Sequence, residues 1–190
     1  MSDGDAPKAL DTDRLCELTR ASADASSHAF AQFSGLPLRV SETSAISAEA
    51  PLEPGRWPKG IFFDIEGKLE GQIGILLSPT LCEAVEGVAS GRGLTDALDS
   101  MLLELGNIVA SQTVSAIADG VRGRIVLSIP HLVTEGADRE LAWRIAHGSH
   151  AAATAGLQRI DAAFTDESGS HCALVILVPQ PVLDASSRSV

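Results

Sequence analysis

Three polar residues have the spacing of a single helical face and are the first candidates for chemistry. Ser100, Glu104 and Asn107 follow one another at intervals of four and three residues, so an α-helix would place their side chains on one side. Asn107 is the only asparagine in the chain. Asparagine disfavours helix interiors because its side chain competes for backbone hydrogen bonds. A carboxylate and a carboxamide one turn apart can hold water or a polar partner, whereas the commoner role of such a face is a solvated surface.

The surrounding residues predict the helix that carries this face. We expect a helix from Thr95 to Asp119, with Gly120 as its stop. Its apolar residues form a stripe that would face the core, consisting of Leu98, Met101, Leu102, Leu105, Ile108 and Val109. The polar residues would then point away from the core, on a rigid support.

A fourth residue completes a known motif. Pro130 follows Asn107 after 22 residues, and Ser100-x3-Glu104-x2-Asn107-x22-Pro130 resembles the motif of the CheC/CheX/FliY chemotaxis phosphatases. In that family the first position is Asp or Ser. The segment ELGNIVASQTVSAIADGV also resembles the family's active helix. The hairpin together with ILLSPTLCEAVEG resembles the segment that precedes the active helix in that family. The resemblance covers about residues 10 to 180.

The resemblance implies an enzyme that hydrolyses the aspartyl phosphate on the receiver domain of a CheY-type response regulator. Because an acyl phosphate has a good leaving group, such a catalyst mainly positions water and stabilises charge. By resemblance, Asn107 orients the attacking water and Glu104 contacts the receiver's lysine. Ser100 and Pro130 hold the structural positions of the motif. The Mg²⁺ of the reaction belongs to the receiver, so the resemblance implies no cofactor of the chain's own.

The order of the elements and the resemblance predict an α+β, CheC-like fold with internal duplication, in which long helices pack on an antiparallel β-sheet. We expect pseudo-repeats at about 10–90 and 95–180 within one domain, 10–183. A shift of 100 residues lays IFFDIEGKLEGQIGILLSP on DAAFTDESGSHCALVILVP. Residues 1–9 and 184–190 are expected to be disordered tails.

The first half carries a degenerate copy of the motif. Asp13 and Glu17 fit its beginning, but Arg20 stands at the asparagine position and Thr43 at the proline position. A guanidinium is always charged and only donates hydrogen bonds, so it cannot accept from water as an amide can. One active centre is therefore expected, as in the single-centre CheX-like members.

The remaining elements follow from apolar periodicity and from turn residues. The pattern predicts a helix over 11–35, a strand over 36–40, a hairpin over 60–79 and a helix over 79–90, followed after the long helix by a strand over 124–130, a helix over 137–147 and a hairpin over 157–179. The two hairpin turns are expected around Gly67 and Gly169.

Composition excludes several classes of protein. Lys and Arg total 14 against 25 Asp and Glu, a net charge of −11, and the chain has no tyrosine. An acidic surface opposes phosphate binding, which argues against a nucleic-acid partner. The N-terminus has neither the basic n-region nor the apolar h-region of a signal peptide. The longest purely apolar run, 172–178, is too short for a membrane span. We therefore expect a cytoplasmic protein without a membrane partner.

Cysteine and histidine usage indicates neither a disulfide framework nor a metal site. The three cysteines, Cys16, Cys82 and Cys172, are far apart, which suits a reducing compartment. His147 and His150 lack the spacing of a zinc site. Trp57 and Trp143 are interpreted as packing or interface anchors.

The expected partner is a phosphorylated CheY-type response regulator. A CheD-type deamidase and a homodimer, formed through a sheet edge or around Trp143, are further partners compatible with the resemblance. The alternative function is a non-catalytic module of the same fold that docks a receiver or a motor component. The complete motif around Asn107 favours the enzyme.

Overall fold

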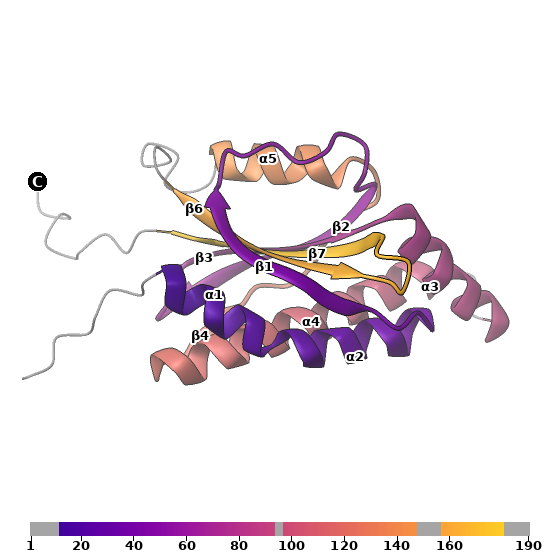
Figure 1. The fold of residues 1–190 in the computed structure, drawn as a ribbon, viewed down its shortest axis with the longest axis horizontal. Coiled ribbons are helices and arrows are strands. Elements are labelled where there is room, and N and C mark those ends of the chain that lie inside the picture. The colour runs from indigo at the N-terminus through magenta and orange to yellow at the C-terminus, as the bar shows by residue number, and fades with distance from the viewer. Residues whose placement is uncertain (1–11, 94–96, 148–156, 181–190) are drawn as a thin grey trace, which may run out of the picture.

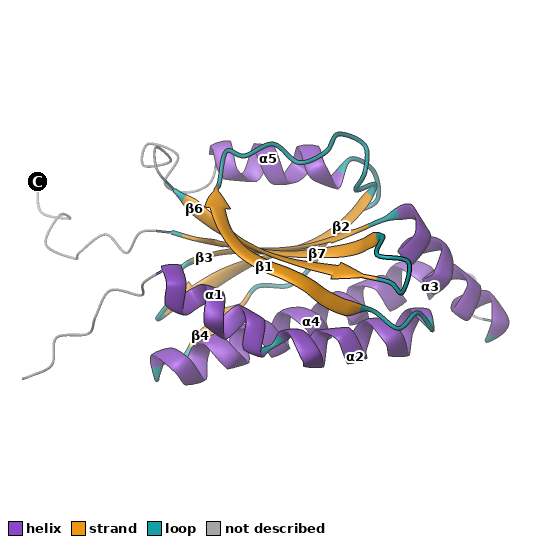
Figure 2. Ribbon diagram, in the orientation of Figure 1, coloured by secondary structure: helices purple, strands orange, loops and turns teal. Residues whose placement is uncertain are grey.

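One antiparallel sheet lies between two layers of helices (Figures 1 and 2). The computed structural model describes residues 12–93, 97–147 and 157–180. The predicted tails, 1–9 and 184–190, lie outside the described residues. Within them the elements are α1 (Thr12–Ala21), α2 (Ala23–Ser34), β1 (Arg39–Ser47), β2 (Lys59–Gly67), β3 (Gly71–Leu77), α3 (Pro79–Gly91), α4 (Leu98–Val121), β4 (Ile125–Leu127), β5 (His131–Val133), α5 (Ala137–His147), β6 (Gln158–Thr165) and β7 (His171–Pro179). The predicted α+β class is confirmed.

The sheet shows the predicted internal repetition as a pseudo-twofold arrangement. Its strand order is β1-β6-β7-β3-β2-β4. Strand β5 pairs with the same edge of β2 as β4 does, at a different part of β2. Hairpins β2–β3 and β6–β7 meet at the centre, where Ile75 pairs with Val175, exactly 100 residues later in the chain. Each half gives its edge strand to the other, because β1 pairs with β6 whereas β4 and β5 pair with β2. The boundaries of the pseudo-repeats, about 10–90 and 95–180, stay a prediction.

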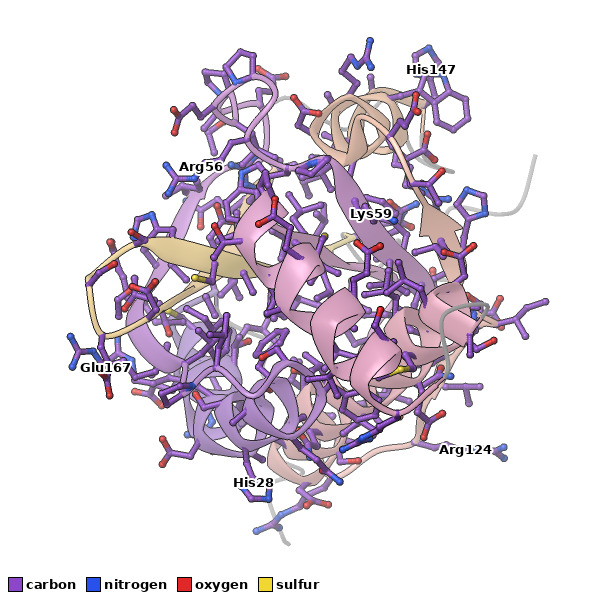
Figure 3. The ribbon with its side chains drawn as sticks, turned by 90° about the vertical axis from the view of Figure 1, so that its right-hand side faces the viewer. His28, Arg56, Lys59, Arg124, His147 and Glu167 are labelled. Carbon is purple, nitrogen blue, oxygen red and sulfur yellow. The ribbon has the colours of Figure 1, made fainter. Side chains whose placement is uncertain are left out.

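The helices are divided unequally between the two faces of the sheet. The apolar stripes of α1, α2, α3 and α4 pack on one face, around fully buried residues such as Phe30, Leu81 and Leu105. Of the described helices, α5 alone lies on the other face, where Trp57, Phe62 and Leu141 share a smaller core. Figure 3 shows the two layers from the side, with His147 of α5 at the top and His28 of α2 at the bottom.

Two glycines explain how α4 comes so close to its neighbours. A Cβ on Gly106 would lie 2.8 Å from Ile61 of β2, and one on Gly120 would lie 2.5 Å from Leu18 of α1. Gly120 is therefore a contact residue and not the helix stop that the sequence suggested. The helix continues to Val121 and ends at Arg122, whose backbone is left-handed. The described helix begins at Leu98, and its predicted start, Thr95, lies outside the described residues.

The predicted first helix is two helices. It breaks at Ser22, whose hydroxyl donates to the Thr19 carbonyl and competes with the helical hydrogen-bond pattern. The second part ends at Gly35, as expected. The strand predicted over 36–40 begins at Arg39 and continues to Ser47. The helix over 137–147 and both hairpins agree with the prediction.

The strand predicted over 124–130 is interrupted. Both β4 and β5 pair with β2, but Leu127 lies opposite Ile65 whereas Leu132 lies opposite Ile61. The three residues 128–130 therefore lie opposite only two residues of β2, 63–64, and the extra residue forms a β-bulge. Sequence alternation missed the bulge because it specifies no register.

Among the described helices, α4 has the length and composition that would allow a membrane span. About 50% of its apolar window is buried inside the protein. That burial follows from its place in the helix layer, where α4 packs against the sheet and beside α1, α2 and α3.

Candidate functional site on helix α4

The structure places Ser100, Glu104 and Asn107 together on one side of α4, as predicted. Ser100 and Glu104 are exposed, whereas Asn107 is half-buried. The opposite side of the helix carries Leu102, Leu105 and Val109, which are fully buried in the core. The predicted core stripe is therefore confirmed in its centre, while its outer members Leu98, Met101 and Ile108 are half-buried.

The packing around α4 shows which neighbour borders Asn107. On one flank, Gly120 meets Leu18 of α1, and Thr113 accepts a hydrogen bond from Ser22 between α1 and α2. On the other flank α4 packs against β4 and β5, the edge strands of the sheet. Val121 follows Asn107 by 14 residues, close to four helical turns, so the two residues lie on the same side of α4. Val121 ends the helix on this second flank, and the chain continues into β4. Asn107 thus lies toward the edge strands.

Pro130 belongs to the same edge. It is half-buried and lies in the bulge between β4 and β5, two residues before Leu132, which packs into the core beneath α4. Pro130 thus lies between the two edge strands against which α4 packs. Proline suits this edge because it has no N–H to contribute to a ladder.

Neither Glu104 nor Asn107 is engaged within the described part of the chain. Their side chains make no hydrogen bond or ion pair there. The Glu104 carboxylate can accept hydrogen bonds or pair with a cation, and the Asn107 amide can both donate and accept. A helix that is fixed by its buried face presents both groups to a partner.

The degenerate motif is arranged differently. Arg20 Nη2 donates to the Thr43 carbonyl oxygen at 3.2 Å, so the structure does bring these two positions together. Glu17 is paired with Arg14 at 2.9 Å. Asp13 stands on the exposed first turn of α1. The side chains of Glu17 and Arg20 thus already have partners within the protein.

The other candidates of the sequence fall outside this site. Trp57 is buried in the α5-side core, whereas Trp143 is 57% exposed and stacks on His147, with ring centroids 5.1 Å apart. His147 Nδ1 lies 2.9 Å from the Trp143 carbonyl oxygen, and His150 lies outside the described residues. In the described ranges no group of three or more His, Cys, Asp or Glu could hold a metal ion.

Sequence reasoning missed a buried ion pair on β6. Arg159 Nε donates to Asp161 Oδ1 at 3.0 Å, and Arg159 also binds the Ala48 and Ala50 carbonyls. Burial raises the pKa of the Asp161 carboxyl above its ordinary value, and the guanidinium of Arg159 only partly offsets that effect. A cavity of about 340 Å³ lies beside Arg159, between α5 and the segment 48–52. The sequence signal for this ion pair is the presence of opposite charges at alternate positions of one strand, Arg159 and Asp161, whose side chains point to the same face of the sheet.

Known structures share this fold. The CheX protein of Desulfovibrio desulfuricans is 12% identical, and the match covers 86% of this chain and 99% of that chain at a TM-score of 0.62. A chain of the CheX–CheY–BeF3–Mg²⁺ complex from Borrelia burgdorferi is 14% identical, and the match covers 91% of this chain and 100% of that chain at a TM-score of 0.52. The FliM middle domain of Vibrio alginolyticus is 12% identical, with 87% and 93% covered and a TM-score of 0.53.

At these identities the comparisons define the class of fold. The chain has the fold shared by CheX, CheC-like and FliY chemotaxis proteins and by FliM middle domains, and the resemblance of the sequence to that family is confirmed at this level. No protein-family model matches the sequence, and no curated protein sequence matches it either.

Proposed function

We propose that this protein hydrolyses the aspartyl phosphate of a CheY-type receiver domain at the α4 face. The observation that carries the proposal is the pair Glu104 and Asn107, which are unpaired within the described chain on a rigid helix, next to the edge that holds Pro130. One structure with this fold is a CheX–CheY complex, which supports a CheY-type protein as the partner.

Asn107 acts on the attacking water. Its carboxamide oxygen accepts a hydrogen bond from the water, which directs a lone pair of the water toward phosphorus. Attack in line breaks the bond between phosphorus and the aspartyl oxygen, so inorganic phosphate and a free aspartate result. A neutral amide suits this place because a second carboxylate would repel the phosphoryl group.

Glu104 acts on the receiver. Its exposed carboxylate pairs with the lysine beside the phosphorylated aspartate and so fixes how the two proteins are oriented. The Mg²⁺ of the reaction belongs to the receiver's site. Ser100 and Pro130 support the geometry of the α4 face and exchange no proton.

The degenerate motif around Arg20 does not contribute to the proposed hydrolysis. An arginine bound to the Thr43 carbonyl is neither neutral nor available as an acceptor for water. We therefore propose one active centre per chain and a cytoplasmic setting, where response regulators are phosphorylated.

The decisive experiment measures phosphate release from a receiver domain of the same genome. The receiver is phosphorylated with a small phosphodonor, the donor is removed, and decay is followed with and without this protein. We expect faster decay with wild type and the unstimulated rate with Asn107→Ala. No acceleration by the wild type with any receiver of the genome would refute the phosphatase.

The second candidate is a docking module without catalysis. It is favoured by the FliM middle domain, whose similarity in fold is close to that of the CheX complex. The same assay separates the two functions, because a docking module binds the receiver and leaves the decay rate unchanged.

A further inference from the structure

The side chain of Ile129 is exposed to solvent, next to the motif residue Pro130. Its side chain is 90% exposed, against 57% for Trp143 and 41% for Val126, the other large apolar residues that are exposed in the described chain. A single exposed apolar residue is ordinary on a mobile loop. Ile129, however, occupies the β-bulge between β4 and β5, where the backbone is constrained.

The bulge is fixed on both sides by hydrogen bonds and by proline. The Ser128 N–H donates to the Asp64 carbonyl at 3.0 Å, and the Asp64 N–H donates to Ser128 Oγ at 2.9 Å. The same hydroxyl donates to the Ile129 carbonyl at 3.0 Å. Pro130 restricts Ile129 to extended conformations. The extra residue is thus aimed outward by a defined backbone.

This position borders the face that carries Asn107. The bulge joins Leu127 to Leu132, and both of these residues pack into the core that α4 covers. The neighbouring Pro130 is a motif residue, and α4 packs against β4 and β5 on either side of the bulge. A partner that contacts Asn107 and extends to Pro130 would therefore reach the neighbouring Ile129 as well.

We propose that Ile129 is an apolar anchor for the receiver domain and sets the affinity of docking at the α4 face. This inference rests on the proposed function. An exposed ion pair such as that of Glu104 contributes orientation but little affinity, since it is solvated and screened. An isoleucine that is already ordered loses little conformational entropy when it is covered, so its burial contributes to affinity. The partner should present an apolar depression beside its phosphorylated aspartate.

The test compares Ile129→Ser with two control variants. Ile129→Leu keeps the apolar volume, and Trp143→Ser removes an exposed apolar residue from the opposite, α5 side of the sheet. Binding is measured by titration against the receiver loaded with beryllofluoride and Mg²⁺, and turnover is measured against receiver concentration.

We expect Ile129→Ser to bind about tenfold more weakly, the loss given by burying part of one aliphatic side chain. KM should rise while kcat at saturating receiver stays at the wild-type value, because the water and Asn107 are untouched. Ile129→Leu and Trp143→Ser should both behave as wild type.

Two different failures can be told apart. If wild type neither binds nor dephosphorylates any receiver, the proposed function fails and this inference fails with it. If wild type is active but Ile129→Ser keeps the same affinity and KM, Ile129 is no anchor and the phosphatase stands. A fall in kcat with unchanged affinity would also overturn the anchor.

Discussion

At the scale of the residue, the two motifs differ in whether their side chains already have partners. Arg20 donates a hydrogen bond to the Thr43 carbonyl and Glu17 pairs with Arg14, so both side chains already interact within the protein. Glu104 is exposed and has no partner in the described chain, so a binding protein can use its full hydrogen-bonding capacity. An available group of this kind can form a new contact when the receiver docks, and contacts that are strongest in the transition state are the ones that raise the rate.

The first prediction concerns Asn107→Ala. We expect phosphate release to fall by roughly 100-fold or more, the usual loss for one oriented polar contact in a transition state. The free energy of unfolding should change by no more than about 0.5 kcal/mol, because the amide has no partner to lose. Activity, receiver binding and urea unfolding are measured together. Ser115→Ala, also exposed on α4, serves as the control, and equal rates for Asn107→Ala and wild type would contradict the role.

The second prediction concerns the charge of Glu104. Glu104→Lys should weaken both binding and turnover, because attraction to the receiver's lysine becomes repulsion. Glu104→Gln keeps the shape and one acceptor, so its defect should be milder and mostly in KM. Combined with Asn107→Ala, either change should be non-additive in turnover. Normal binding by Glu104→Lys would show that the receiver docks elsewhere.

At the scale of the element, α1 and β1 form a structural counterpart to α4 and the β4–β5 edge. We expect Arg20→Ala to leave dephosphorylation unchanged. It should lower the free energy of unfolding by about 1 kcal/mol, the typical net value of one hydrogen bond, because the Thr43 carbonyl loses its donor. A loss of activity as large as that of Asn107→Ala would mean that the first half is catalytic.

The ion pair on β6 gives a prediction about pH. Because the pKa of Asp161 is raised by burial, the folded state binds its proton more tightly than the unfolded state does. Its contribution to stability is therefore largest in acid and falls as the pH rises above the ordinary value of 3.8. Asp161→Asn should remove this fall, which is measured by urea unfolding between about pH 3.5 and 7 in matched buffers.

Asp166 provides a control of opposite sign. The Ser168 hydroxyl donates to its carboxylate at 2.6 Å and lowers the pKa of Asp166. Its contribution is present above pH 3.8 and is lost as the pH falls through the lowered pKa. Asp166→Asn should therefore alter the pH dependence of the free energy of unfolding only below about pH 3.8, and above that pH its curve should run parallel to that of wild type. If Asp161→Asn and wild type had parallel curves above pH 3.8, burial would not govern that carboxyl.

Local patterns predicted the elements better than the contacts between them. Helix α5 and both hairpins could be read from periodicity and turn residues, because their signals lie within a few neighbouring positions. The break at Ser22 and the bulge before Pro130 depend on packing and register, which periodicity does not encode. The spacing of Glu104 and Asn107 placed them on one face, but only the structure showed that this face borders the β4–β5 edge.

At the scale of the whole molecule, the exchange of edge strands makes the two halves interdependent. We expect the chain cut between Gly93 and Ala97 to give two fragments that are each largely unfolded, since each lacks the strand that covers its hairpin. Mixed together, they should refold and regain phosphatase activity. Circular dichroism of the separate and mixed fragments checks this, and a stable fold of either fragment alone would contradict it.

The same exchange of edges suggests how the chain arose. A single half with this topology would have no complete sheet, but two identical copies related by an axis through the central strand pair would complete each other as an isologous dimer. Such a dimer would carry two equivalent copies of the motif. If α4 performs the proposed reaction, one copy is enough after fusion into a single polypeptide, and the other position is free to hold an arginine. Arg20 now connects α1 to the edge strand β1 through the Thr43 carbonyl.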